Sequence, residues 1–162
     1  IPGIDRENVF GIEDILLGRR VIEGRKVAVI GGGHVGLEVA HFLCANNKVT
    51  IVEMADEIGA SVYYITKFKL LPLLREAGVT FRTGQAIAAV DDGSIRLRDT
   101  HTGQCTELKA EAVVLAMGSR PDLAARAAFD RNFDHVVYAG DAVRGGTMLE
   151  ANRDAFALAW EF

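Results

Sequence analysis

The stretch KVAVIGGGHVGLE, residues 26–38, decides the fold of this chain. A short apolar strand leads into glycines with the spacing G-x-G-x-x-G, at Gly31, Gly33 and Gly36, and a helical pattern follows. A second apolar run then ends at Glu53. Strand, glycines, helix, strand and acid in this order predict a βαβ unit that binds a dinucleotide. The alternative is an ordinary turn between a strand and a helix, because glycine-rich turns also occur for conformational reasons alone.

Each glycine of the motif is expected to have its own task. Gly31 lets the chain turn sharply, Gly33 lets a pyrophosphate approach the backbone, and Gly36 lets the helix pack closely on the strands. The N–H groups at the start of the helix then point at the phosphates. The predicted phosphate-binding turn consists of Gly31, Gly32, Gly33, His34, Val35 and Gly36. Either a protonated His34 ring contacts the pyrophosphate, or the ring is partly exposed and only its backbone N–H takes part.

The acid after the second strand selects the cofactor. Glu53 can accept a hydrogen bond from a ribose 2′-hydroxyl and would repel a 2′-phosphate. Met54 follows it without a positive charge, and the nearest later base is Lys67. The sequence therefore favours NAD(H) over NADP(H), unless Glu53 is only a solvated acid at a strand end. Inside the helix, Glu38 either fixes the glycine turn by hydrogen bonding or faces water.

Composition excludes several other classes of protein. The chain has 162 residues, 49% of them hydrophobic and 25% charged, with a net charge of −4, which indicates one globular domain without a nucleic-acid footprint. No apolar run is long enough to span a membrane, and no signal peptide is visible. Cys44 and Cys105 are far apart, which suggests thiols in a reducing cytoplasm. The histidines have no metal-type spacing, so no metal site is expected. A start at Ile1 suggests an excised piece.

Apolar patterning along the chain predicts an α/β fold: a Rossmann-like parallel sheet with an antiparallel β-meander as one crossover. Turn signals at Asp92-Gly93 and Thr102-Gly103 mark the meander. Pro72 predicts a kink or a new helix start inside its helical segment. The expected helices are 12–17, 35–46, 60–77 and 147–162, and the expected strands are 26–30, 48–53, 79–82, 86–91, 94–98, 104–108, 112–117 and 136–139.

Several motifs together resemble one family over nearly the whole chain: IPGID, VAVIGGGHVGLEVA, VTIVEMADEI, VVLAMGSRPD and VVYAGDAV. They resemble the C-terminal NAD(P)-binding part of NADH:flavin oxidoreductases of the old yellow enzyme and 2,4-dienoyl-CoA reductase type, in the pyridine nucleotide-disulfide oxidoreductase superfamily. The resemblance is weaker through residues 60–77.

The resemblance implies a domain order. Residues 1–18 and 119–162 would be edges of a discontinuous flavin-binding domain, and residues 19–118 would be the NAD(H)-binding domain inserted into it. The rest of the flavin domain, and a barrel carrying FMN and an iron–sulfur cluster, would lie outside this chain. These missing domains and NADH would be its partners, with no nucleic acid and no membrane. Exposed apolar residues on these edges would favour association, for example as a homodimer; the candidates are Ile15, Leu16, Phe129, Phe156 and Trp160.

The resemblance also implies site residues and an activity. Met117 and Gly118 would face the nucleotide, although Met117 is equally plausible as core. Asp141 would accept a hydrogen bond from a ribityl hydroxyl of FAD, or else cap its own turn. In the whole protein NADH would deliver hydride to FAD for reduction of an activated C=C bond, with no catalytic side chain in this chain. The isolated chain is expected to be inactive.

Two other functions use a similar glycine turn. The domain could hold ADP without redox chemistry, as in trimethylamine dehydrogenase of the same group. An S-adenosylmethionine enzyme also has a glycine-rich turn after its first strand, but the meander and the Gly140-Asp141 motif argue against this class.

Overall fold

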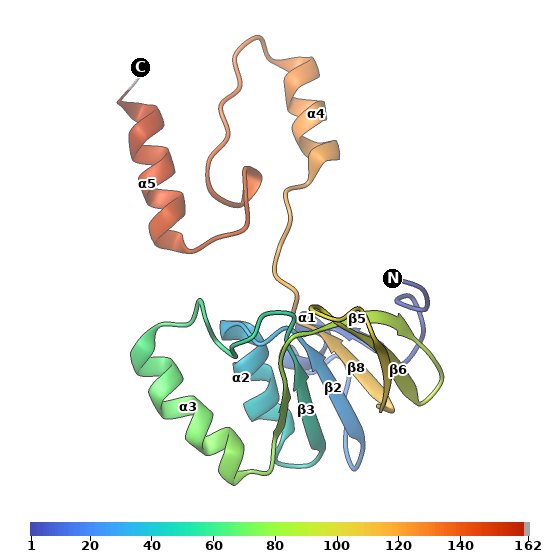
Figure 1. Ribbon diagram of the computed structural model, residues 1–162. Coiled ribbons are helices and arrows are strands. Elements are labelled where there is room, and N and C mark those ends of the chain that lie inside the picture. Colours follow the sequence, from blue (N-terminus) through green and yellow to red (C-terminus); the bar gives the residue numbers. More distant parts are fainter. Residues whose placement is uncertain (161–162) are drawn as a thin grey trace. The chain divides into compact units, whose positions relative to one another are not determined.

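The structure is a computed structural model that describes residues 1–160. The chain divides into two compact units, Ile1–Met117 and Gly118–Phe162. Figure 1 follows the chain through both units. The last two residues, at which the expected helix 147–162 ends, lie outside the described range. Each unit is described by itself.

A five-stranded parallel sheet forms the centre of the first unit. Across the sheet the strands stand in the order β1 (Val9–Gly11), β8 (Ala112–Leu115), β2 (Lys26–Ile30), β3 (Lys48–Val52) and β4 (Thr80–Arg82). Every neighbouring pair runs parallel. The prediction of one parallel sheet with β2, β3 and β4 side by side is confirmed. Strand β1 was not predicted: it pairs Val9 with Val113 at the edge of the sheet.

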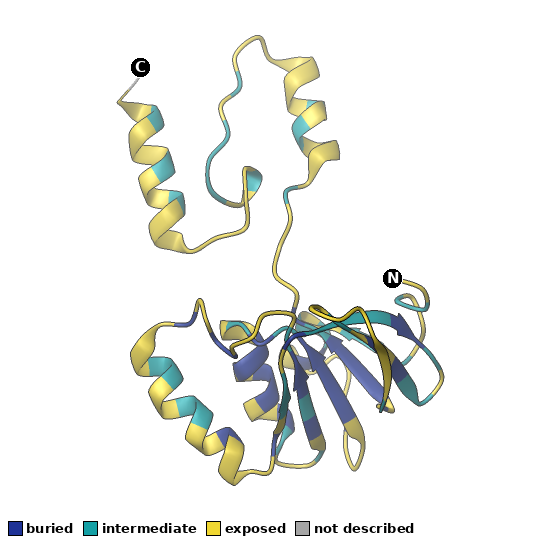
Figure 2. Ribbon diagram, viewed as in Figure 1, coloured by how far each residue is buried: buried dark blue, intermediate teal, exposed yellow. Residues whose placement is uncertain are grey.

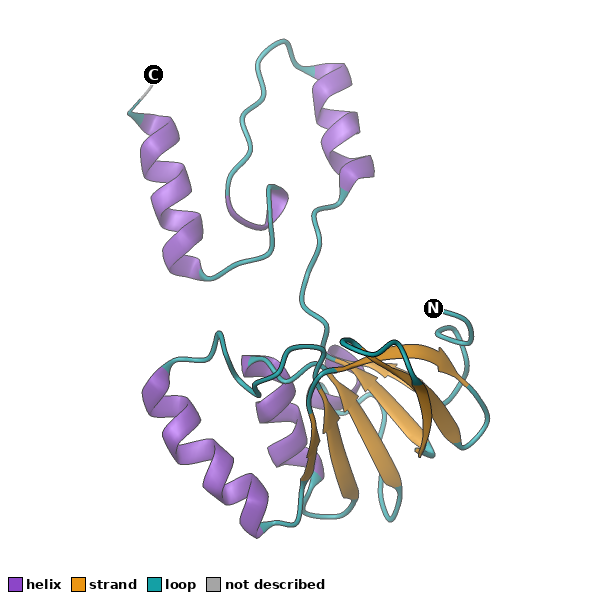
Figure 3. Cartoon of the chain, viewed as in Figure 1, coloured by secondary structure: helices purple, strands orange, loops and turns teal. Residues whose placement is uncertain are grey.

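The two faces of this sheet carry different layers (Figure 3). One face packs against the helices α1 (Ile12–Leu16), α2 (His34–Leu43) and α3 (Tyr64–Glu76). The other face packs against an antiparallel three-stranded sheet in the order β5 (Gln85–Val90), β6 (Ser94–Asp99) and β7 (Cys105–Lys109). This second sheet is the predicted meander, and its presence confirms the predicted fold class.

Each face of the central sheet has its own apolar core, which Figure 2 shows as buried strands. Val27 and Val29 of β2 belong to the helix-side core, whereas Ala28 and Ile30 belong to the meander-side core. Successive side chains of a strand point to opposite faces, so a strand covered on both faces must be apolar throughout. This requirement explains the continuous apolar run that precedes the glycine motif.

Helix α3 shows how packing overrides a local helix breaker. It runs through Pro72 as one helix, so the expected alternative of a new helix start at Pro72 is wrong. Proline removes one N–H bond, here to the carbonyl of Phe68. Phe68 is exposed, so water can satisfy that carbonyl, while the fully buried Leu74 fixes the last turn to the core.

Residues 1–18 pack with the first unit. Strand β1 extends its sheet, and Ile15 of α1 is only 2% exposed within the helix-side core. Ile15 therefore does not belong to the exposed apolar surface, whereas Leu16 is about half exposed.

The second unit contains helices and loops as far as residue 160. Its elements are α4 (Leu123–Asn132), the 3-10 turn η1 (Gly140–Ala142) and α5 (Met148–Ala159). The strand expected at 136–139 is wrong: these residues form no strand. A strand satisfies its backbone groups by pairing, and residues 118–160 contain no strand that could be its partner. Two residues that were expected to favour association are exposed: Phe156 of α5 at 69%, and Trp160, which follows α5, at 82%.

Candidate nucleotide-binding site

The predicted nucleotide-binding residues of the first unit follow three neighbouring strands at the same edge of the sheet. The glycine turn follows β2, Glu53 and Met54 follow β3, and Met117 comes shortly after β8. The segments are joined by backbone hydrogen bonds, from Gly31 N–H to the Val52 carbonyl at 2.8 Å and from Ala116 N–H to the Ile30 carbonyl at 2.8 Å. Ligands of open α/β sheets bind at this carboxyl edge.

Two glycines of the motif are required by the fold. Gly31 has φ +108°, and an added Cβ would lie 2.3 Å from the carbonyl oxygen of Ala116. An added Cβ at Gly36 would lie 2.0 Å from the carbonyl oxygen of Gly31. Backbone atoms cannot move away from such contacts cheaply, so these two positions allow α2 to begin directly against the end of β2.

Gly33 differs from these two. It is the N-cap of α2 with φ −74° and ψ −171°, extended backbone that any residue adopts. An added Cβ would have no atom of this chain within 4 Å. The fold therefore does not require glycine at this position, whereas a ligand that approaches the backbone would.

The N-terminus of α2 has no side-chain cap. The same holds for α3, whereas Thr147 and Glu150 form a capping box at α5 and Asp122 caps α4. The first N–H groups of a helix have no partner within the helix. At α2 they are next to the space in front of Gly33, which fits a bound pyrophosphate. His34 and Val35, in the first turn, are both exposed.

The carboxylate of Glu53 is fixed against the glycine turn. Its Oε2 accepts a hydrogen bond from Gly32 N–H at 2.6 Å, and its Oε1 accepts one from Ala55 N–H at 2.9 Å. Each carboxylate oxygen has two lone pairs, so each can accept one further bond. Glu53 is half-buried. It is thus an oriented acceptor beside the turn rather than a freely moving acid.

Glu38 faces water, which is the second of the two roles predicted for it, and does not hold the glycine turn. Its Oε1 pairs with Nε2 of His34 at 3.1 Å, one helical turn away, and both side chains are about half exposed. The acid that holds the glycine turn is Glu53, from the neighbouring strand. Helical spacing alone could not reveal this contact, because it joins residues that are 21 positions apart.

The remaining predicted residues surround the turn or lie in the other unit. Met54 is 67% exposed and Met117 is 52% exposed, so neither is ordinary core. Gly118 has φ +81° and begins the second unit. Asp141 belongs to the second unit, where its Oδ1 accepts a bond from Gly146 N–H at 3.2 Å and its Oδ2 accepts one from the Ser119 hydroxyl at 3.3 Å.

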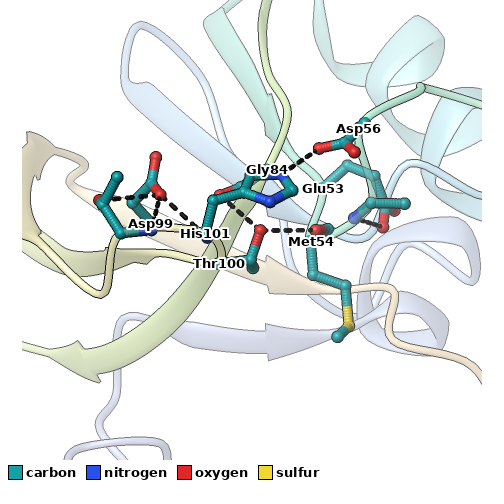
Figure 4. Close-up of polar contacts among 9 residues, drawn as sticks. Glu53, Met54, Asp56, Gly84, Asp99, Thr100 and His101 are labelled. Carbon is teal, nitrogen blue, oxygen red and sulfur yellow. Dashed lines mark hydrogen bonds and ion pairs between the residues drawn. The ribbon is translucent and has the colours of Figure 1, made fainter.

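A polar network beside Glu53 was missed by the sequence interpretation (Figure 4). His101 Nε2 lies 2.6 Å from Oδ1 of Asp56, in the loop that follows β3. This carboxylate raises the pKa of the His101 imidazole above its ordinary value. Hydrogen bonds from Thr102 hold the pKa of Asp99 below its ordinary value. The partners His101 and Asp56 are 45 positions apart, so only the signal of the Thr102-Gly103 turn was available in the sequence.

No group of three or more metal-binding side chains occurs within residues 1–160. Over the same range, no helix is both long and apolar enough to cross a membrane. Cys44 and Cys105 are both free thiols.

Comparison with known proteins places this geometry in a family. Residues 1–137 match the family model described as pyridine nucleotide-disulphide oxidoreductase. An NADH oxidase of Thermoanaerobacter brockii is 32% identical over 99% of this chain, and a cinnamate reductase of Clostridium sporogenes is 30% identical over 98%. The chain spans 25% and 24% of the length of these two relatives.

Solved structures agree with this placement. The 6-hydroxypseudooxynicotine amine oxidase of Pseudomonas geniculata N1 has a TM-score of 0.73 at 30% identity, covering 95% of this chain and 24% of its own. A 2-naphthoyl-CoA reductase has a TM-score of 0.78 at 26% identity, covering 100% of this chain and 24% of its own. The family implies binding of FAD and NAD(P)H. The chain belongs to the pyridine nucleotide-disulphide oxidoreductase family.

Proposed function

We propose that the first unit binds NADH, with the pyrophosphate at the glycine turn and the adenosine ribose at Glu53. One observation carries the proposal: the half-buried Glu53 carboxylate is fixed on Gly32 N–H, beside the open space at Gly33. A ribose 2′-hydroxyl could donate to the free lone pairs of that carboxylate. Met54 follows Glu53 directly in the same loop, while Met117 and Gly118 would line the nicotinamide half, after the end of β8.

Charge around Glu53 supports NADH over NADPH. Residues 53–57 contain the acids Glu53, Asp56 and Glu57 and no base. The nearest later base, Lys67, forms an ion pair with Glu57. A 2′-phosphate placed here would meet these carboxylates and be repelled by them.

For the whole protein we propose a flavoprotein that passes hydride from NADH to FAD and reduces an activated C=C bond. When bound, NADH supplies the hydride. The cinnamate reductase and 2-naphthoyl-CoA reductase names among the similar proteins support this substrate class. In this proposal 19–118 is the NAD(H)-binding domain, and 1–18 and 119–162 belong to the flavin-binding domain, with Asp141 toward FAD. Further domains would carry FMN and an iron–sulfur cluster.

The proposal also covers the cellular compartment and the assembly of the protein. Free Cys44 and Cys105 suit a reducing cytoplasm. The exposed aromatic side chains of α4 and α5 would be covered by the rest of the flavin domain, or by a second copy in a homodimer.

A second candidate is a domain that holds ADP without accepting hydride. The similarity to an amine oxidase supports this candidate. In trimethylamine dehydrogenase, which the chain also resembles, the equivalent domain holds ADP and does not accept hydride from NADH. Glycine turn and ribose acid would serve ADP as well as NADH, so the site geometry supports both.

Titration of the 162-residue chain with NADH, NADPH, ADP and S-adenosylmethionine tests these alternatives, with fluorescence or calorimetry as the readout. NADH and ADP are expected to bind, NADPH more weakly, and S-adenosylmethionine not at all. Binding of NADPH as tight as that of NADH would contradict the role of Glu53. Rapid mixing of the whole flavoprotein with NADH separates the two candidates: bleaching of the flavin absorbance indicates hydride transfer, and an unchanged spectrum indicates an ADP-type domain.

A further inference from the structure

We propose that the turn of residues 99–103, between β6 and β7, positions the ribose-binding loop of residues 53–56 through His101 and Thr100. His101 and Thr100 are then positioning residues that set how strongly the site recognises the ribose 2′-hydroxyl. This inference rests on the proposed function, because it assumes that Glu53 contacts the ribose.

The 99–103 turn has a fixed shape of its own. Oδ1 of Asp99 accepts hydrogen bonds from the backbone N–H of His101 at 3.0 Å and of Thr102 at 2.7 Å, and from the Thr102 hydroxyl at 2.9 Å. Three bonds to one carboxylate oxygen orient the backbone of the turn. The turn can therefore serve as a fixed support for the side chains that it presents.

From this turn two side chains reach the ribose-binding loop (Figure 4). His101 Nε2 lies 2.6 Å from Oδ1 of Asp56. The Thr100 hydroxyl lies 3.0 Å from the carbonyl oxygen of Gly84 and 3.4 Å from that of Met54. Thr100 N–H also donates to the Gly84 carbonyl at 2.8 Å.

The loop in turn sets the Glu53 carboxylate. Gly84 N–H donates to the Ala55 carbonyl at 2.9 Å, and Ala55 N–H donates to Glu53 Oε1 at 2.9 Å. The other oxygen, Oε2, accepts from Gly32 N–H at 2.6 Å. A continuous path of hydrogen bonds therefore runs from the meander turn through the ribose-binding loop to the glycine turn.

The ion pair with Asp56 gives His101 a second role, which is to offset one negative charge in the ribose-binding loop. Of the three acids in residues 53–57, Glu57 pairs with Lys67 and Asp56 pairs with His101. Within the described residues, Glu53 has only backbone N–H partners. Neutralising Asp56 and Glu57 reduces repulsion within the loop and leaves Glu53 as the acid that a ribose hydroxyl meets.

The test compares the dissociation constants of ADP and 2′-deoxy-ADP for the 162-residue chain. The two ligands differ only by the 2′-hydroxyl, so their ratio measures its recognition. We expect the unmodified chain to prefer ADP by about tenfold, because hydrogen bonds to a charged group are strong. We expect His101→Ala to lower the ratio to about threefold, and Asp56→Ala, which removes the other partner of the same contact, to lower it similarly.

Controls separate positioning from general damage. His41→Ala removes another exposed histidine, in the last turn of α2, and should leave the ratio unchanged. His101→Gln keeps an N–H donor for Asp56 and should restore part of the preference. Circular dichroism and the thermal midpoint should show all variants folded, since the His101 and Asp56 side chains are 64% and 73% exposed.

The outcomes distinguish the two levels of the proposal. A ratio near one in the unmodified chain would refute ribose recognition by Glu53, and with it the proposed function. A tenfold ratio that persists in both His101→Ala and Asp56→Ala would overturn only the positioning role. Equal loss of affinity for ADP and 2′-deoxy-ADP would overturn it as well, because the effect would then not concern the ribose.

Discussion

Replacing Gly33 with valine tests whether glycine at this position is needed for NADH binding rather than for folding. The backbone at Gly33 is extended, and an added Cβ meets no atom of the chain within 4 Å. The cost to stability is then limited to the poorer N-cap, about 1 kcal/mol or less in free energy of unfolding. The valine side chain would instead occupy the space proposed for the pyrophosphate. We expect NADH affinity to fall at least about 100-fold, or about 3 kcal/mol.

The assay combines titration with NADH and urea unfolding of the same preparation. Gly36→Ala is the matched control, since its Cβ would lie 2.0 Å from the Gly31 carbonyl oxygen. Such an overlap should destabilise the fold by about 1–3 kcal/mol or more. Gly33→Val should therefore lose affinity for NADH but stay folded, whereas Gly36→Ala should lose stability. Unchanged NADH affinity in Gly33→Val would show that the nucleotide binds elsewhere, and strong unfolding of that variant would show that the position is structural.

Three further predictions concern charge, pH and flavin binding. Glu53→Arg should shift the ratio of NADPH to NADH affinity by about tenfold or more toward NADPH, measured by titration; an unmoved ratio would contradict the assignment. Asp56 raises the pKa of His101 above 6.5, with Asp99 as the other acid acting on it, so their pairing is complete at lower pH and lost as pH rises through the raised pKa. The ADP preference over 2′-deoxy-ADP should therefore fall as the pH rises through this raised pKa, and a flat profile would count against His101. The purified chain should carry no flavin absorbance and should not oxidise NADH; a yellow preparation with one equivalent of flavin would refute this.

The central part of the fold could be predicted because local and global signals agree there. The apolar runs of β2 and β3 are covered on both faces, and the glycine spacing marks the turn between β2 and α2. These residues are also the ones that carry the motif. The expected and observed strands β2 and β3 therefore agree to within a residue.

Outside this region, whether a segment forms a strand depends on a neighbouring strand to pair with, and the hydrophobic periodicity of the segment does not specify that neighbour. Strand β1 has three residues, too few to show a period, and it forms because β8 has a free edge. The run 136–139 has the composition of a strand, but residues 118–160 contain no other strand with which it could pair. Helix α4 was missed although Asp122 is a recognisable N-cap before an alanine-rich segment.

The candidate site could be predicted as a set of residues but not as a network. The roles of Gly31 and Gly36 follow from backbone geometry that the motif itself encodes. The contacts of Glu53 to Gly32 and of His101 to Asp56 join segments 21 and 45 positions apart. Such contacts depend on how the meander and the helices pack against the central sheet, and this packing cannot be read from a single sequence.

The pairing of β1 with β8 has a consequence for how the first unit is assembled. Val9 pairs with Val113, so the first strand of this unit finds its neighbour only after nearly all of the unit has been made. Contacts between such distant positions carry a high loop-closure entropy and form late. During synthesis β1 stays an unpaired strand, and α1 cannot yet bury Ile15 in its final core. Closure of this edge is thus expected to be the last and slowest step of folding, and the unfinished edge is where a nascent chain would be most open to wrong pairing.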